Sequence, residues 1–281
     1  MKANDKFLNL PKTFWANVRL ISQEVGYTAR GTDQIKIPSV NEIELKLDKL
    51  AIDFDQLQIQ KVGSQKLDVL LNEYFTYRAD ALNTYVEPRL MDGRKAKQVF
   101  LDHLARLKPS CPIPMNKQKG NKKAPAYLTG LVNMLIEANS KGLPCDYDPH
   151  QLTTITQNGL PLRTLARRVD GAFPSSLNPI AIWEIKEYYY TTTFGSRVAD
   201  GIYETLLDGL ELEELREHEG IKIHHYLIID AHDTWWTQGK SYLCRIIDLL
   251  HMGLIDEVLF GYEVVERLPS LVKEWTSQLV K

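Results

Sequence analysis

Apolar side chains recur at helical spacing in the first third of the chain. Over residues 12–25 they fall on one side of a helix, at Phe14, Trp15, Val18, Ile21 and Val25. A second helix is expected from Ser39, because a serine followed three residues later by Glu42 forms a capping box. Two more helices are expected over residues 64–87 and 93–107. The pattern therefore predicts a helical N-terminal region.

Beyond residue 126 the pattern alternates between helix and strand. Residues 127–138 carry an apolar stripe at helical spacing and are expected to form a helix. Strands are expected at 151–157, 164–173, 179–190, 222–230 and 256–262. Further helices are expected at 196–217, 240–252 and 267–279. We therefore expect an α/β fold in which a helix and three strands precede a helix and a fourth strand.

Prolines and lysines are concentrated between these two parts. Four prolines lie within residues 109–125, and four lysines lie close together at Lys117, Lys119, Lys122 and Lys123. Segments of this composition commonly separate compact regions. We therefore expect a helical region over residues 1–110, a basic linker over 111–126 and an α/β core over 127–281.

Charged residues interrupt the apolar strand expected at 179–190. Glu184 and Lys186 are two residues apart, so they share one face of a strand. Such charges are costly on an apolar strand unless a metal ion, a partner charge or an anionic ligand compensates them. Asp170, which ends the run R-R-V-D, can join Glu184 as an oxygen ligand of Mg²⁺, and Lys186 can offset phosphate charge or orient a water. The alternative is a surface hairpin with an ion pair of little energetic value.

This arrangement resembles the PD-(D/E)xK nuclease superfamily, which includes most type II restriction endonucleases. The resemblance rests on Asp170, Glu184 and Lys186 and on the order of elements over roughly residues 125–262; Val169 stands where the family has a proline. It implies a restriction-endonuclease-like core, a mixed central sheet flanked by helices in the order αβββαβ. It also implies catalysis by this trio with Mg²⁺, and a homodimer acting on double-stranded DNA, since cutting a symmetric sequence calls for two-fold symmetry.

Four other residues are candidates for the same site. Glu137 lies on the helix before the strands, where the family often has a further metal-proximal carboxylate; an ordinary exposed glutamate is the alternative. Ser196 and Arg197 open a helix whose N-terminus can hold a phosphate, or they belong to an ordinary capped helix. Arg168 is two residues before Asp170 and would share its face of a strand, so it is expected to approach DNA or to pair with an acidic neighbour.

Contacts to the DNA backbone are expected from the basic linker. Lys117, Lys119, Lys122 and Lys123 can release counterions from phosphates, or they form a solvated loop. Base contacts are expected from the N-terminal region, where residues 20–31 resemble half of a helix-turn-helix; such units are also frequent in proteins that do not bind DNA.

The composition limits these expectations only modestly. A formal net charge of −2 neither favours nor excludes nucleic acid, because a metal-dependent nuclease needs acidic residues in its site. The three cysteines lie far apart, which suggests no zinc site or disulfide framework and fits a reducing cytoplasm. The chain shows no signal peptide and no apolar run long enough for a membrane span, so we expect a soluble cytoplasmic protein without a membrane partner.

The sequence thus predicts a Mg²⁺-dependent DNA endonuclease of the type II restriction kind. Two alternatives remain, a repair or phage-defence nuclease of the same fold and a DNA-binding protein without turnover. The intact Asp170, Glu184 and Lys186 set argues against a binder, which has no need of metal-binding carboxylates. Because the carboxylates are expected to be exposed, Asp170→Ala or Glu184→Ala should abolish cleavage and leave folding intact.

Overall fold

The computed structural model describes residues 1–29, 32–118, 121–190 and 195–279, without the side chains of residues 117–118, 121–123 and 196–197. Contacts divide the chain into two compact units. The sheet unit comprises Met1–Lys2, Arg89–Thr234 and Leu254–Lys281, and the helical unit comprises Ala3–Pro88 and Trp235–Gly253. Within the described residues no helix is long and apolar enough to cross a membrane.

A four-stranded mixed sheet forms the centre of the sheet unit. Its strands run in the order β10 (Glu257–Phe260), β9 (His224–Asp230), β8 (Ala181–Glu187) and β7 (Gly171–Phe173). β7 pairs with β8 in antiparallel fashion, whereas β8 with β9 and β9 with β10 are parallel. The parallel pairs require crossover connections, which α7 and α8 supply between successive strands.

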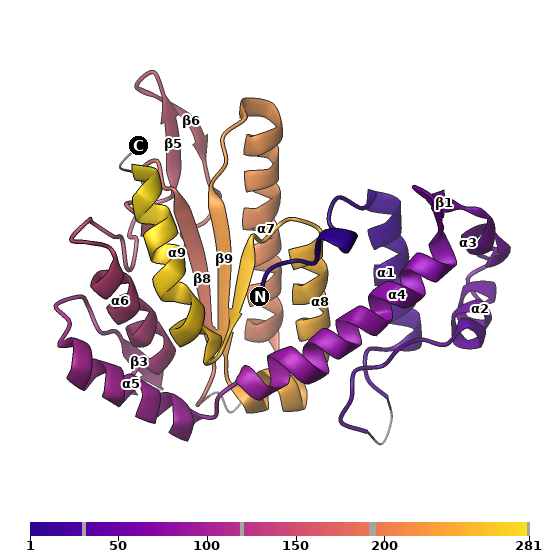
Figure 1. The fold of residues 1–281 in the computed structure, drawn as a ribbon, viewed down its shortest axis with the longest axis horizontal. Helices are drawn as coiled ribbons and strands as arrows, with labels where there is room; N and C mark the ends of the chain where they lie inside the picture. Colours follow the sequence, from indigo (N-terminus) through magenta and orange to yellow (C-terminus); the bar gives the residue numbers. More distant parts are fainter. Residues whose placement is uncertain (30–31, 119–120, 191–194, 280–281) are drawn as a thin grey trace. The chain divides into compact units, whose positions relative to one another are not determined.

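Helices cover both faces of this sheet (Figure 1). α6 (Tyr127–Asn139) and α9 (Glu263–Leu279) pack on one face, and α7 (Ser196–Glu219) packs on the other. The unit also contains α5 (Gly93–Leu107), the hairpin of β3 (Met115–Gln118) with β4 (Asn121–Pro125), and the hairpin of β5 (Thr154–Gln157) with β6 (Leu160–Thr164).

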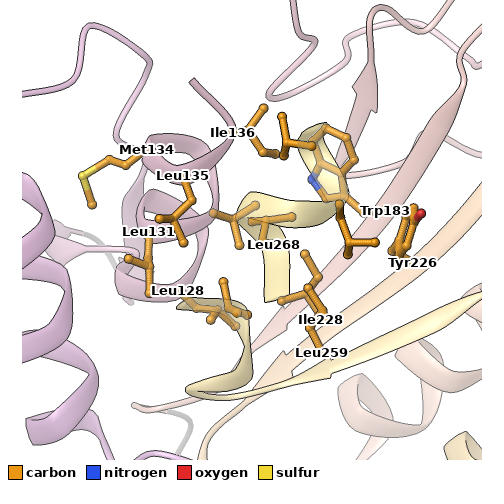
Figure 2. Close-up of a cluster of buried hydrophobic side chains, with 14 of the residues drawn as sticks. Leu128, Leu131, Met134, Leu135, Ile136, Trp183, Tyr226, Ile228, Leu259 and Leu268 are labelled. Carbon is orange, nitrogen blue, oxygen red and sulfur yellow. The ribbon is translucent and has the colours of Figure 1, made fainter. Parts of the chain in front are cut away.

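The main apolar core lies between the sheet and the pair α6 and α9 (Figure 2). Leu128, Leu131 and Leu135 of α6 meet Trp183 and Ile228 of the sheet, all of them almost fully buried. Trp183 also stacks on Trp275 of α9, with ring centroids 5.7 Å apart and planes 6° apart. The odd-numbered residues of β8 therefore belong to this core, and its even-numbered residues face α7.

The helical unit is built from α1 (Lys12–Val25), α2 (Val40–Asp48), α3 (Asp55–Ile59), α4 (Leu67–Asp80) and α8 (Lys240–His251), with a small hairpin of β1 (Lys61–Val62) and β2 (Gln65–Lys66). The expected capping box is present, since Ser39 and Glu42 each accept a hydrogen bond from the other's backbone N–H. The expected apolar stripe of α1 is buried, with Phe14, Trp15, Val18 and Ile21 at most 4% exposed.

A buried ion pair joins three helices of this unit. Arg78 of α4 donates to both oxygens of Asp248 on α8, at 3.0 and 3.1 Å, and to Ser22 Oγ on α1 at 3.0 Å. Tyr74 also donates to Asp248, at 2.6 Å. Arg78 and Asp248 are 1% and 4% exposed, so neither charge has water as an alternative partner.

Arg78→Met is expected to destabilise the protein by about 3–5 kcal/mol, because it leaves the Asp248 carboxylate buried without its cation. Urea denaturation measures this change. The double variant Arg78→Met with Asp248→Leu should recover much of the loss, since it removes both charges. A single variant as stable as the wild-type protein would contradict this view of the pair.

Several elements differ from those expected. The strand expected over 164–173 is interrupted, because β6 ends at Thr164 and residues 165–170 form a loop before β7. Leu165 and Val169 are both buried, a four-residue spacing that strand alternation would also give, so the burial pattern along the sequence does not reveal the loop. The helix expected over 64–87 begins only at Leu67, after the hairpin of β1 and β2. α1 and α2 are separated by 14 residues, so the expected half of a helix-turn-helix lacks its short turn.

The two units also divide the chain differently from the expected regions. α5 belongs to the sheet unit, because Phe100 packs against Gly130 of α6 and joins the main core. The segment 111–126, expected to be a linker, carries β3 and β4 of the same unit. α8, expected in the core, groups with the helical unit, where Asp248 binds Arg78.

Candidate active site

The end of the 165–170 loop lies beside the middle of β8. Asp170 immediately precedes β7, and its Oδ2 accepts a hydrogen bond from Ile185 N–H at 2.7 Å. In return, Asp170 N–H donates to Glu184 Oε1 at 3.3 Å. Glu184 and Lys186 share the face of β8 toward α7, and Lys186 Nζ donates to Glu184 Oε2 at 2.8 Å. The structure therefore brings Asp170, Glu184 and Lys186 together.

A second cation, Arg167, enters this group from the loop. Its Nη1 donates to Glu184 Oε1 at 2.8 Å and to Asp208 Oδ2 at 2.6 Å, and its Nη2 donates to Glu184 Oε2 at 3.2 Å. Both oxygens of Glu184 are thus paired with Arg167, and one of them also with Lys186. No role for Arg167 was expected from the sequence.

α7 supplies the other side of the group. Glu204 and Asp208 are one helical turn apart, so both project toward β8. Glu204 Oε2 accepts from Lys186 Nζ at 2.8 Å, and Gly201 leaves room for the aliphatic part of Lys186, which would lie 3.1 Å from an added Cβ. Neither acidic residue was expected from the sequence, although their spacing on the helix after the Glu-x-Lys strand is a usable signal.

We call Arg167, Asp170, Glu184, Lys186, Glu204 and Asp208 the charged cluster. Its four carboxylates and two cations leave an excess of negative charge when all are ionised. Glu184 and Asp208 have side chains that are 0% exposed, whereas that of Arg167 is 21% exposed. Glu204 is 40% exposed, so the cluster is partly buried, and one further positive charge would bring it closer to neutrality.

The pKa values of the carboxyl groups differ within the cluster. Burial, and then the charge of Glu184, raises the pKa of Asp170 to about 6. Burial likewise raises the pKa of Asp208 to about 7, because it outweighs the attraction of Arg167. Burial also opposes ionisation of Glu184, but Lys186 and Arg167 together hold the pKa of this carboxyl below its usual value. The pKa of Lys186 is raised by Glu184 and Asp170 against the effect of burial, so it carries a proton at neutral pH.

The cluster has the chemistry of a site for a hard divalent cation. Carboxylate oxygens are the ligands that Mg²⁺ prefers, and Oδ1 of Asp208 is buried without a hydrogen-bond partner among the described residues. In the present arrangement, however, no three acidic, histidine or cysteine side chains of the described part of the chain are placed to coordinate one metal ion. The carboxylate oxygens are donors of the type that Mg²⁺ prefers, and Arg167 lies between Glu184 and Asp208.

β8 is also fixed through its other face. The carboxylate of Glu187 accepts hydrogen bonds from Tyr127 N–H at 2.8 Å and Thr129 N–H at 3.1 Å, at the first turn of α6. This turn has free N–H groups and a positive dipole end, so a carboxylate suits it. The same short strand therefore supports the charged cluster on one face and anchors α6 on the other.

The remaining predicted residues do not join this group. Glu137 lies near the C-terminal end of α6, where its carboxylate accepts hydrogen bonds from Ser110 N–H at 3.0 and 3.2 Å. Arg168 is exposed and does not lie on a strand, because the loop 165–170 replaces the expected one. The side chains of Ser196, Arg197, Lys117, Lys122 and Lys123, and the whole of Lys119, lie outside the described residues.

Two family models match the chain. Residues 91–275 match the family described as Domain of unknown function (DUF7687), and residues 1–85 match Domain of unknown function (DUF7690). Because the first match covers more than half of the chain, the protein belongs to the DUF7687 family. The boundary between the two matches falls beside the change from the helical unit to the sheet unit at Arg89. No curated protein and no solved structure matches the chain.

Proposed function

We propose that this protein is a Mg²⁺-dependent endonuclease that hydrolyses phosphodiester bonds of DNA. One observation carries the proposal: Asp170, Glu184 and Lys186 meet on one face of a mixed sheet, in a buried group with an excess of carboxylates. A group of this kind is expensive to bury, and functional sites are where such a cost is commonly retained.

The strand directions support the same proposal. The residue pattern resembles PD-(D/E)xK nucleases, whose core has the order αβββαβ. In this protein α6 is followed by β5, β6, β7 and β8, then by α7 and β9. β7, which Asp170 immediately precedes, pairs in antiparallel fashion with β8, which carries Glu184 and Lys186, and β9 adds in parallel through α7. The extra strand arises because β5 and β6 form a separate hairpin.

Each residue of the trio has a role that its surroundings favour. Asp170 and Glu184 would hold the metal ion through their carboxylate oxygens. Mg²⁺ bound there would supply Lewis-acid stabilisation of the charge that develops on the phosphate. Lys186, protonated and held by Glu184 and Glu204, would act as a cation and hydrogen-bond donor that orients water or phosphate.

The finer form of the proposal is a type II restriction endonuclease that cuts duplex DNA as a homodimer. Its support is the resemblance of the residue pattern, together with the symmetry that cutting both strands of one site requires. The lysines of the 111–126 segment are the expected contacts with the DNA backbone.

Incubation of the purified protein with plasmid DNA and Mg²⁺ tests the proposal directly. We expect linear or nicked products that EDTA suppresses, and sequencing of the ends shows whether cleavage is specific. Discrete ends fit a restriction enzyme, and scattered ends fit a nuclease of repair or phage defence. Intact plasmid and intact single-stranded DNA across Mg²⁺ and Mn²⁺ concentrations would refute the nuclease proposal.

A further inference from the structure

We propose that Arg167 and a divalent cation compete for one position in the charged cluster, between Glu184 and Asp208, and that Asp208 is a metal ligand contributed by α7. The inference deepens the proposed function and rests on it for the choice of metal. It concerns two residues, Arg167 and Asp208, that the Asp-Glu-Lys pattern does not contain.

The first argument is the position of one nitrogen atom. Nη1 of Arg167 lies 2.8 Å from Glu184 Oε1 and 2.6 Å from Asp208 Oδ2, so it bridges a strand carboxylate and a helix carboxylate. A cation at this point is attracted by both groups. A divalent ion needs the same oxygen atoms at slightly shorter distances, about 2.0–2.6 Å for Mg²⁺ or Ca²⁺. Arg167 and the ion therefore cannot both hold these two oxygens.

The second argument is the unused oxygen of Asp208. This side chain is 0% exposed, and its Oδ1 has no hydrogen-bond partner in the described part of the chain. Burying an acceptor without a partner costs free energy, so such an atom usually has a function or a further ligand. A metal ion bound beside Asp208 would give this oxygen the partner that Arg167 does not provide.

The third argument is that, of the three residues Arg167, Glu184 and Asp208, Arg167 is the one whose side chain can move away. Glu184 is fixed within β8 and Asp208 within α7, whereas Arg167 lies in the loop 165–170. Its side chain is also the exposed one, at 21% against 0% for both carboxylates. Turning outward, the guanidinium would reach water, and it would then be available to an anion such as a phosphate.

The exchange also improves the charge balance. With Arg167 in place, the four carboxylates outnumber the two cations. Replacing a single positive charge with a double one brings the buried group closer to neutrality. In the present arrangement Arg167 supplies the positive charge at this position.

Calorimetric titration of the full chain with Mn²⁺ and with Ca²⁺ tests this competition without any need for cleavage. Arg167→Gln should bind the ions more tightly than the wild-type protein, by about tenfold or more, since it removes the competing charge. Arg168→Gln is the matched control, because it makes the same change at the exposed neighbouring residue and should leave affinity unchanged. Asp208→Asn should weaken binding by about 10- to 100-fold, whereas Asp200→Asn, exposed on the same helix, should not.

The outcomes separate this inference from the nuclease proposal. If the wild-type protein cuts DNA but Arg167→Gln binds metal no better and Asp208→Asn binds it equally well, the inference is wrong and the nuclease stands. If both variants shift metal affinity as expected while no DNA is cut, the inference stands and the nuclease fails. If thermal unfolding shows that Arg167→Gln does not fold, the comparison of metal affinity between Asp208→Asn and Asp200→Asn decides the question by itself.

Discussion

Glu184→Gln is expected to abolish cleavage of plasmid DNA by the Mg²⁺-loaded protein, by about three or more orders of magnitude in rate. The amide keeps the size of the side chain but removes the charge that pairs with Arg167 and Lys186 and that would bind the proposed metal ion. Asp170→Asn and Lys186→Met should have comparable effects. Because the three residues act as one unit, a double variant should be scarcely worse than a single one. Initial rates on supercoiled plasmid measure these losses.

The control for this series is Glu214→Gln, a change of the same kind at an exposed residue of α7 that pairs with Arg163. It should cut at the wild-type rate. Near-normal cleavage by Glu184→Gln or Asp170→Asn would show that the site lies elsewhere. The structure also alters the choice of variant, because Glu184 is fully buried rather than exposed as the sequence suggested. Glu184→Ala would leave Arg167 and Lys186 without their shared partner, so loss of folding would accompany loss of activity.

The contribution of Asp208 to the free energy of unfolding is expected to fall as the pH rises from about 5 to 8 in EDTA. The pKa of this carboxyl is 3.8 in its unperturbed state and about 7 in the folded protein. Between these values the folded state holds a proton that the unfolded state has released, so raising the pH favours unfolding. The whole effect is on the order of 4 kcal/mol at most. Urea denaturation at a series of pH values measures it.

Asp208→Asn should flatten this pH dependence, since the amide does not titrate. Asp170, whose pKa is about 6 in the folded protein, acts in the same direction, so a part of the slope should remain. Glu184 acts in the opposite direction, but only as the pH falls below the usual 4.5, outside this window. Asp200→Asn is the control. Parallel curves for wild type and Asp208→Asn would contradict the assigned burial of this carboxyl.

Local sequence signals predicted the helices well. The apolar stripe predicted the observed bounds of α1, Lys12–Val25, and the capping box predicted the start of α2. These signals act over a few residues and need no knowledge of distant contacts. The break between β6 and β7 was not predictable in this way, because Leu165 and Val169 are buried by tertiary contacts with Ile182 and α7.

Local periodicity in the sequence also predicted one part of the site. The two-residue period of a strand places Glu184 and Lys186 on one face, and that follows from the sequence alone. The contribution of Arg167 depends on the course of a loop, which no local pattern encodes. For Asp208 the only signal in the sequence is its one-turn spacing from Glu204 on the helix that follows β8. Arg168 looked equally suitable beside Asp170, and only the course of the loop turns Arg167 inward and Arg168 outward.

The double anchoring of β8 determines where the site can adapt. Glu187 ties the strand to the first turn of α6, Trp183 stacks on α9, and each would resist a sliding movement of the strand. Glu184 and Lys186 are therefore preorganised, and little reorganisation energy is available from their backbone. Any adjustment to an incoming ligand falls on the loop that carries Arg167. If Arg167 exchanges with a metal ion as proposed, the motion of this one loop, rather than of the sheet, would set the rate of that exchange.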